Sequence, residues 1–68
     1  MYVKGMIVKM SEQGHKSHGI GLSNPKDVTG VVTGPDDYDK SWFGVNWSNG
    51  HFNNYEEGDL VVVGEESL

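Results

Sequence analysis

The chain has 68 residues, which suffices for one small domain near the lower size limit for folding without disulfides or metals. It contains no cysteine, so a disulfide framework and a thiolate metal site are both excluded. The net charge is −5 and no arginine is present, which removes the side chain best suited to bidentate contacts with phosphate and guanine. This composition therefore disfavours nucleic-acid binding.

Charge is unevenly distributed along the chain. Residues 1–35 carry four lysines and two acids, whereas residues 36–68 carry eight acids and one lysine. An acidic C-terminal half favours a basic partner, although a net charge of this size also serves solubility alone. No apolar run is long enough to span a bilayer, and the lack of cysteine fits a reducing compartment, so we expect a cytoplasmic protein without membrane contact.

The N-terminal half predicts two strands separated by a long loop. Residues 5–10 form one β-rich run, and residues 28–33 form a second around Gly30, where a strand glycine often marks a bulge or bend. Residues 11–27 contain three glycines and a proline, with neither a helical nor an alternating period. We expect this segment to be a long loop that Ile20 and Leu22 fix against the core.

The C-terminal half predicts three further strands, over residues 41–47, 51–55 and 60–63. Alternation of Phe43, Val45 and Trp47 puts three large apolar groups on one face of the first of these strands. Asn49-Gly50 supplies two residues of positive φ for a two-residue type I′ turn, which reverses the chain at once.

Five short strands without a helical period predict an all-β protein. Their connections are a long loop between strands one and two, a tight third link and a short final one, which indicates a five-stranded SH3-like barrel. An OB-like barrel is the alternative, but it would need longer strands and commonly a helix. We expect the barrel to occupy residues 1–64 and residues 65–68 to form a flexible acidic tail.

Part of the C-terminal half resembles Mib/HERC2 domains. The matching residues are Gly44-Val45-Asn46-Trp47-Ser48-Asn49-Gly50, Asn53, Tyr55 and Asp59-Leu60. The strand Val28-Thr29-Gly30-Val31-Val32 is similar to one common to KOW-like and Mib/HERC2 barrels. The resemblance implies a small barrel that serves as a binding module, for peptide segments of partners in the Mib type and for RNA or ribosomal and transcription proteins in the KOW type.

The third strand and the hairpin it forms are expected to have one core face and one contact face. Alternation and a two-residue turn place four apolar side chains in the core: Phe43, Val45, Trp47 and Phe52. Trp42 has the opposite parity, so we expect it on the other face with Asn46, near Tyr55 and Tyr38. Exposed tryptophan and tyrosine are enriched at binding hot spots. As an alternative, Trp42 could cover the open end of the barrel as a lid.

These features predict a non-catalytic protein-interaction module that docks a protein partner through the exposed aromatic face with its acidic rim. The small size suits a phage or accessory-element protein that modifies a host complex. The alternative is a KOW-like module associated with RNA, DNA or transcription and ribosomal proteins, which requires the lysines of the first half to gather on one face. We expect a monomer or weak self-association, since an unpaired edge strand could pair with a second copy.

Candidate metal-ligating and catalytic groups are weakly supported. His15 and His18 form an H-x-x-H spacing that could hold zinc or nickel on a helix, but the glycine-rich loop around them preorganises nothing. Asp36, Asp37 and Asp39 lack the distal glutamate of a calcium loop. A barrel of this size offers little volume for a nucleophile or an acid–base pair. We therefore expect no catalysis, no cofactor and no metal.

Overall fold

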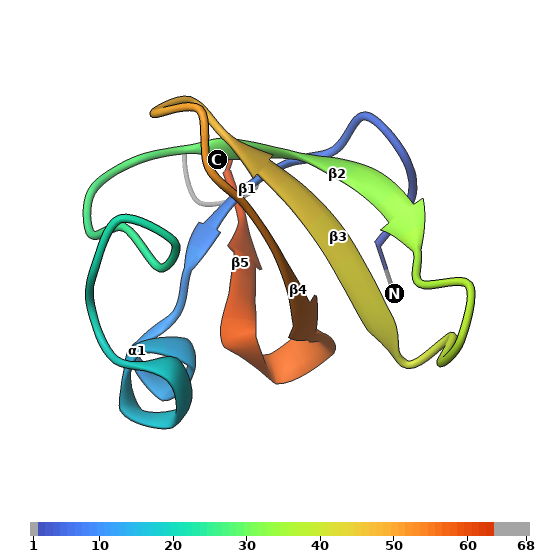
Figure 1. The fold of residues 1–68 in the computed structure, drawn as a ribbon, viewed down its shortest axis with the longest axis horizontal. Helices are drawn as coiled ribbons and strands as arrows, with labels where there is room; N and C mark the ends of the chain where they lie inside the picture. Colours follow the sequence, from blue (N-terminus) through green and yellow to red (C-terminus); the bar gives the residue numbers. More distant parts are fainter. Residues whose placement is uncertain (1, 64–68) are drawn as a thin grey trace.

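Five antiparallel strands form one sheet in the computed structural model, which describes residues 2–63 (Figure 1). In chain order the elements are β1 (Ile7–Met10), α1 (Glu12–His18), β2 (Gly30–Pro35), β3 (Trp42–Trp47), β4 (Phe52–Glu56), the 3-10 helix η1 (Glu57–Asp59) and β5 (Leu60–Val62). The predicted all-β class with five strands is therefore confirmed. The expected tail over residues 65–68 lies outside the described residues.

The strand order across the sheet is β4-β3-β2-β1-β5, so β4 and β5 form its two edges. Within the described residues no backbone ladder joins β4 to β5, and hydrogen bonds therefore do not close the sheet into the expected barrel. Helix α1 lies beside η1. The connection from α1 to β2 runs along the side of the molecule opposite the β2–β3 loop (Figure 1).

The core lies on the inner face of the sheet, because alternation along each strand directs every second side chain inward. Phe43, Val45 and Trp47 of β3 are buried there, as their spacing predicts. Tyr2 packs its ring edge-on against Phe43, with 5.4 Å between ring centroids, so the segment before β1 also covers the core. The remaining buried apolar residues are Val8, Met10, Val32, Tyr55 and Leu60.

The β3–β4 turn has three residues, one more than the sequence interpretation assigns. The Gly50 amide donates to the Trp47 carbonyl, and Gly50 has a φ of 89°. Asn49 does not have the positive φ that a type I′ turn requires. The turn is therefore the three-residue kind, in which a glycine bulge follows a type I turn. Phe52 consequently lies opposite Asn46 instead of Trp47.

This shift of one residue exchanges two aromatic side chains between the faces of the sheet. The sequence pattern predicts Phe52 in the core, but it is exposed on the outer face. The pattern predicts Tyr55 on the exposed face, but it is fully buried opposite Phe43. Because side chains alternate with a period of two, one miscounted turn residue causes both errors.

The sequence interpretation places the β2 bulge at Gly30, but the bulge lies further along the strand. The register between β2 and β3 changes between Val32 and Gly34, and Gly34 has a φ of 129°. Gly30 instead allows close packing, because a Cβ atom there would lie 2.7 Å from Trp47 Cε3 and 2.5 Å from Val45 Cγ1. The glycine that was expected to bend the strand makes room for the core indole.

The segment interpreted as a long loop begins with helix α1. Ser11 is the N-cap, and its Oγ accepts from the Gly14 amide at 3.0 Å. Gly14 approaches the Asp59 carbonyl so closely that a Cβ atom would overlap it. Gly19 follows the helix with a φ of 81° and donates its amide to the His15 carbonyl. A helix of two turns is too short to show a period in the sequence. Gly14 permits the close contact with Asp59, and Gly19 permits the end of the helix.

Candidate functional site

A row of side chains crosses the outer face of the sheet. Phe52 of β4 lies opposite Asn46 of β3, which lies opposite Val31 of β2. Val31 in turn lies opposite Ile7 of β1. Phe52 is 51% exposed, Val31 43% and Ile7 41%. The solvent face of an antiparallel sheet is normally polar, but this outer row (Ile7, Val31, Asn46 and Phe52) places three exposed apolar side chains on it.

A hollow lies beside Phe52 at one end of the outer row. Gly44 lies opposite both Gly34 and Asn54, so neither paired residue of β2 and β3 carries a side chain here, although the bulge brings Thr33 Oγ1 to 2.5 Å from a Cβ atom built on Gly44. A Cβ atom on Gly44 would lie 2.8 Å from Phe52 Cζ, which means that the ring stands against the Gly44 backbone. This glycine hollow has a volume of about 290 Å³ and is lined by Thr33, Gly34, Pro35, Asp36, Asp37, Gly44, Phe52 and Asn54.

The β2–β3 loop contains three aspartates, and two of them, Asp36 and Asp37, line the glycine hollow. Asp36 Oδ2 accepts from the amides of Tyr38 and Asp39 at 3.0 and 3.1 Å. Asp39 Oδ1 accepts from the hydroxyl and the amide of Ser41, and these bonds lower the pKa of Asp39. The Asp37 carboxylate makes no hydrogen bond or ion pair with the described part of the chain. The loop is thus ordered around its acids and presents negative charge at the hollow.

The four residues of the expected aromatic face are not brought together. Asn46 is exposed in the outer row, and Tyr38 is 99% exposed in the β2–β3 loop. Trp42 is half-buried, and its ring packs edge-on against the His18 imidazole with 6.3 Å between centroids. Tyr55 is fully buried, so it cannot contact a partner.

Sequence reasoning missed Phe52, Val31 and Ile7 as surface residues. The sequence Ser48-Asn49-Gly50 fits a three-residue turn with glycine at its third position as well as a two-residue Asn-Gly turn. That third-position glycine was the available signal for the correct register.

Tyr55 anchors the connection between α1 and β2. Its hydroxyl accepts from Trp47 Nε1 at 3.0 Å and lies 2.5 Å from the Ser23 carbonyl and 2.7 Å from Asn24 Oδ1. Asn53 Nδ2 donates to the same Asn24 oxygen at 3.0 Å. Burial is the main reason that the pKa of Tyr55 is raised, and the hydrogen bond from Trp47 opposes the shift. The folded structure therefore favours the neutral, protonated form of the Tyr55 side chain.

Polar contacts, and not the expected apolar ones, hold this connection in place. Ile20 is 64% exposed and Leu22 is 70% exposed, so neither fixes the segment against the core. Asn24 Nδ2 donates to the His18 carbonyl at 3.1 Å, and Asn49 Nδ2 donates to the Leu22 carbonyl at 2.9 Å. Hydrogen bonds from asparagine side chains therefore fix this segment, whereas the sequence interpretation expected burial of Ile20 and Leu22 to do so.

The two histidines of the H-x-x-H spacing have different surroundings. His18 Nε2 lies 2.9 Å from Asp59 Oδ2, and this buried carboxylate also accepts from the Glu56 amide at 3.0 Å. His15 Nδ1 lies 3.5 Å from a backbone carbonyl at the end of α1. His18 thus joins α1 to η1. In the part of the chain that is described, no group of three His, Asp or Glu side chains could hold a metal ion.

A second depression, of about 430 Å³, lies near α1, η1 and the start of β3. Its lining residues are Gln13, Lys40, Ser41, Phe43, Glu56, Glu57 and Gly58. One lysine and two glutamates line it, so a cation that entered would compete with Lys40 for the carboxylates.

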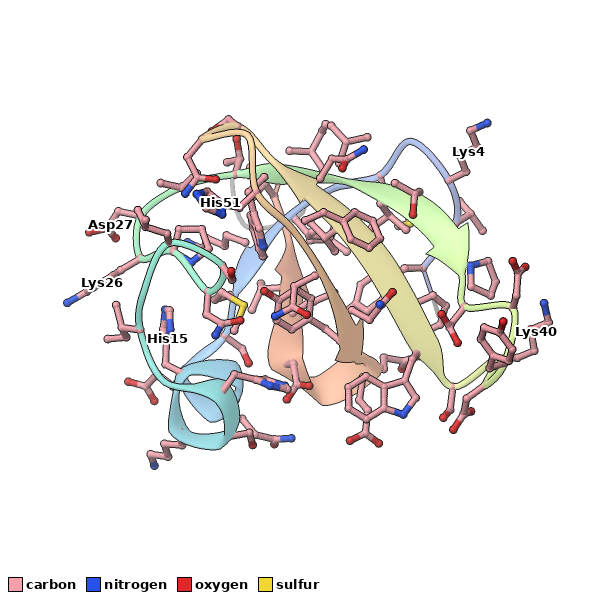
Figure 2. All side chains as sticks on the ribbon, viewed as in Figure 1. Lys4, His15, Lys26, Asp27, Lys40 and His51 are labelled. Carbon is pink, nitrogen blue, oxygen red and sulfur yellow. The ribbon has the colours of Figure 1, made fainter. Side chains whose placement is uncertain are left out.

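The KOW-like alternative requires the lysines of the first half to gather on one face, and two of these lysines lie far apart (Figure 2). Figure 2 shows Lys4 at one end of the molecule and Lys26 at the opposite end. Lys40 lies near the end that carries Lys4 (Figure 2). A nucleic-acid site needs lysines clustered along one surface to neutralise successive phosphates. This arrangement weighs against the KOW-like alternative.

No protein-family model matches the chain, and neither a curated protein nor a solved structure matches it. Over residues 2–63 there is no helix with the length and apolar character needed to cross a membrane. The outer row and the glycine hollow are therefore the features on which a functional inference can rest.

Proposed function

We propose that this protein is a non-catalytic interaction module that docks a protein partner on the outer face of its sheet. The observation that carries the proposal is the outer row, in which Ile7, Val31 and Phe52 are aligned by strand register and exposed. Side chains held by paired strands lose little conformational freedom when a partner covers them. Their burial can therefore contribute to affinity at a low entropic cost.

An acidic rim lies at the Phe52 end of the outer row. Asp36 and Asp37 line the glycine hollow there, and the fully exposed Tyr38 follows them in the same loop. Negative charge beside an apolar surface favours approach by a partner that carries basic groups. Tyr38 can extend the contact, since an exposed phenol offers a large apolar area with a polar end.

Kinship with SH3-like barrels of the Mib/HERC2 and KOW-like kind belongs to the same proposal. It is supported by a long connection between β1 and β2, a three-residue β3–β4 turn and the single link η1 between β4 and β5. Small barrels of this kind serve as binding modules, which suits docking without catalysis. We place the protein in the cytoplasm because the chain lacks cysteine.

The test is affinity capture from a bacterial lysate, with and without nuclease, using the tagged protein and two matched double variants. The outer-row variant carries Val31→Thr and Phe52→Thr. The control variant carries Ile20→Thr and Leu22→Thr, which remove two apolar groups that are even more exposed from the connection between α1 and β2. All four positions are exposed, so both variants should fold, and circular dichroism verifies this.

We expect the wild type and the control variant to retain the same proteins, and the outer-row variant to lose them. Equal retention by the outer-row variant would overturn the proposal. Loss of all retained material after nuclease treatment would show that nucleic acid bridges the contacts, and this result would overturn it as well.

A further inference from the structure

The glycine hollow has a shape that fits one long side chain. The backbone at Gly34 and Gly44 and the Thr33 hydroxyl form its floor, and the Phe52 ring forms an apolar wall. Its volume of about 290 Å³ is at the lower limit of small-molecule pockets, which begin at roughly 300 Å³. The hollow is therefore suited to a side chain presented by a partner rather than to a cofactor.

The margin of the glycine hollow carries two carboxylates that form no ion pair with the described residues. Asp36 uses Oδ2 to accept two backbone amides, and Asp37 has no bond to any residue that the structure describes. No lysine is among the residues between positions 2 and 63 that line the hollow. A cationic group that enters would meet carboxylate oxygens that are not already engaged.

We propose that the glycine hollow receives a lysine or arginine side chain of the docked partner, an inference that rests on the docking function proposed above. The aliphatic stem lies along the Phe52 ring, and the charged head reaches Asp36 and Asp37. The partner segment then continues over the outer row toward Val31, where it meets apolar side chains. One partner residue thus contacts both the Phe52 ring and the two carboxylates.

A bound metal ion is a poorer occupant of the same hollow. Among the lining residues that the structure describes, Asp36 and Asp37 are the only ionisable ones, whereas Ca²⁺ takes six to eight oxygen ligands. The Phe52 wall offers no ligand, whereas it does offer a surface to an aliphatic stem and to a cationic head. An anionic partner group would be repelled.

The test uses blocked pentapeptides as probes of the ¹⁵N-labelled protein in solution. The probe is acetyl-Val-Thr-Arg-Thr-Val-amide, and its control carries citrulline, which has nearly the same shape as arginine but no charge. We expect the arginine peptide to shift the amide resonances of Gly44, Phe52 and Asn54, and the citrulline peptide to bind more weakly. Equal binding of the two peptides would overturn the inference, as would shifts that fall outside the hollow.

Two matched charge variants locate the effect. Asp37→Asn removes a carboxylate that makes no contact with the described residues, so it should leave the fold intact. Asp27→Asn removes the same charge at the end of the molecule that carries Lys26 (Figure 2), and asparagine tolerates the φ of 61° at this position. We expect Asp37→Asn to weaken the arginine peptide by about 2- to 5-fold and Asp27→Asn to leave it unchanged.

Equal weakening by the two variants would overturn the inference, because it would show a general effect of net charge. A response of the same resonances to Ca²⁺ alone, without a response to the arginine peptide, would also overturn it. If lysate capture depends on the outer row but the peptides show no preference for arginine, the docking function stands and only this inference fails. The two claims are therefore separable.

Discussion

Tyr55 couples the core to the connection between α1 and β2 through its hydroxyl group. Without that oxygen, the buried Trp47 Nε1 would lose its acceptor and the Asn24 side chain one of its partners. A buried polar group left unpaired costs about 1–3 kcal/mol. We therefore expect Tyr55→Phe to lower the free energy of unfolding in urea by this amount. Tyr38→Phe, at a fully exposed ring, is the control, and equal losses in the two variants would contradict this role.

The raised pKa of Tyr55 also predicts how stability depends on pH. Because burial favours the neutral phenol, the folded state retains this proton at a pH where an unfolded tyrosine, with a pKa of 10.0, has lost it. The stabilisation is present below about pH 10 and is lost as the pH rises further. Urea midpoints measured up to about pH 11 should fall more steeply for the wild type than for Tyr55→Phe. Parallel curves would show that Tyr55 is not responsible.

At the scale of elements, the contact between α1 and η1 depends on Gly14. Replacing glycine by alanine inside a helix normally stabilises it by about 1 kcal/mol. Here the new Cβ atom would overlap the Asp59 carbonyl oxygen and lie 2.8 Å from Met10 Cε. We therefore expect the opposite sign, a loss of about 1–3 kcal/mol in thermal unfolding for Gly14→Ala. Ser17→Ala on the exposed side of α1 is the control, and a stabilised Gly14→Ala variant would contradict the contact.

The elements also show how much the sequence can predict. Alternation identified Phe43, Val45 and Trp47 as core residues because a strand period of two is a local property. Register is not local in this way: the two possible readings of Ser48-Asn49-Gly50 differ by one residue, and each gives a plausible hairpin. The two-residue turn places Tyr55 on the wrong face of the sheet. The predicted contact face, which included Tyr55, was therefore wrong at that residue.

Helix α1 escaped prediction for a different reason. Its stability depends on tertiary contacts, such as those of Ser11 with the Gly58 carbonyl and of His18 with Asp59, and these contacts join residues more than 40 positions apart. Short helices owe most of their stability to such packing rather than to intrinsic propensity. A segment of this kind cannot be recognised from its own residues.

At the scale of the whole molecule, charge and apolar surface are arranged side by side. The outer row ends at the glycine hollow with Asp36 and Asp37, so the account predicts an electrostatic part in binding. Raising the ionic strength from about 0.01 M to about 0.15 M shortens the Debye length from roughly 30 Å to 8 Å. Affinity for the arginine peptide should therefore fall over this range, while affinity for the citrulline peptide should change little. Equal salt dependence of the two peptides would contradict a local charge effect.

The most direct test of the docking surface is photo-crosslinking in a nuclease-treated lysate. p-Benzoylphenylalanine in place of Phe52 keeps an aromatic ring on the outer row, and the same residue in place of Leu22 serves as the control at a more exposed position outside it. The account predicts a discrete protein adduct from position 52 and none from position 22. An adduct from position 22 alone, or no adduct from position 52, would contradict the claim that the outer face of the sheet docks a protein.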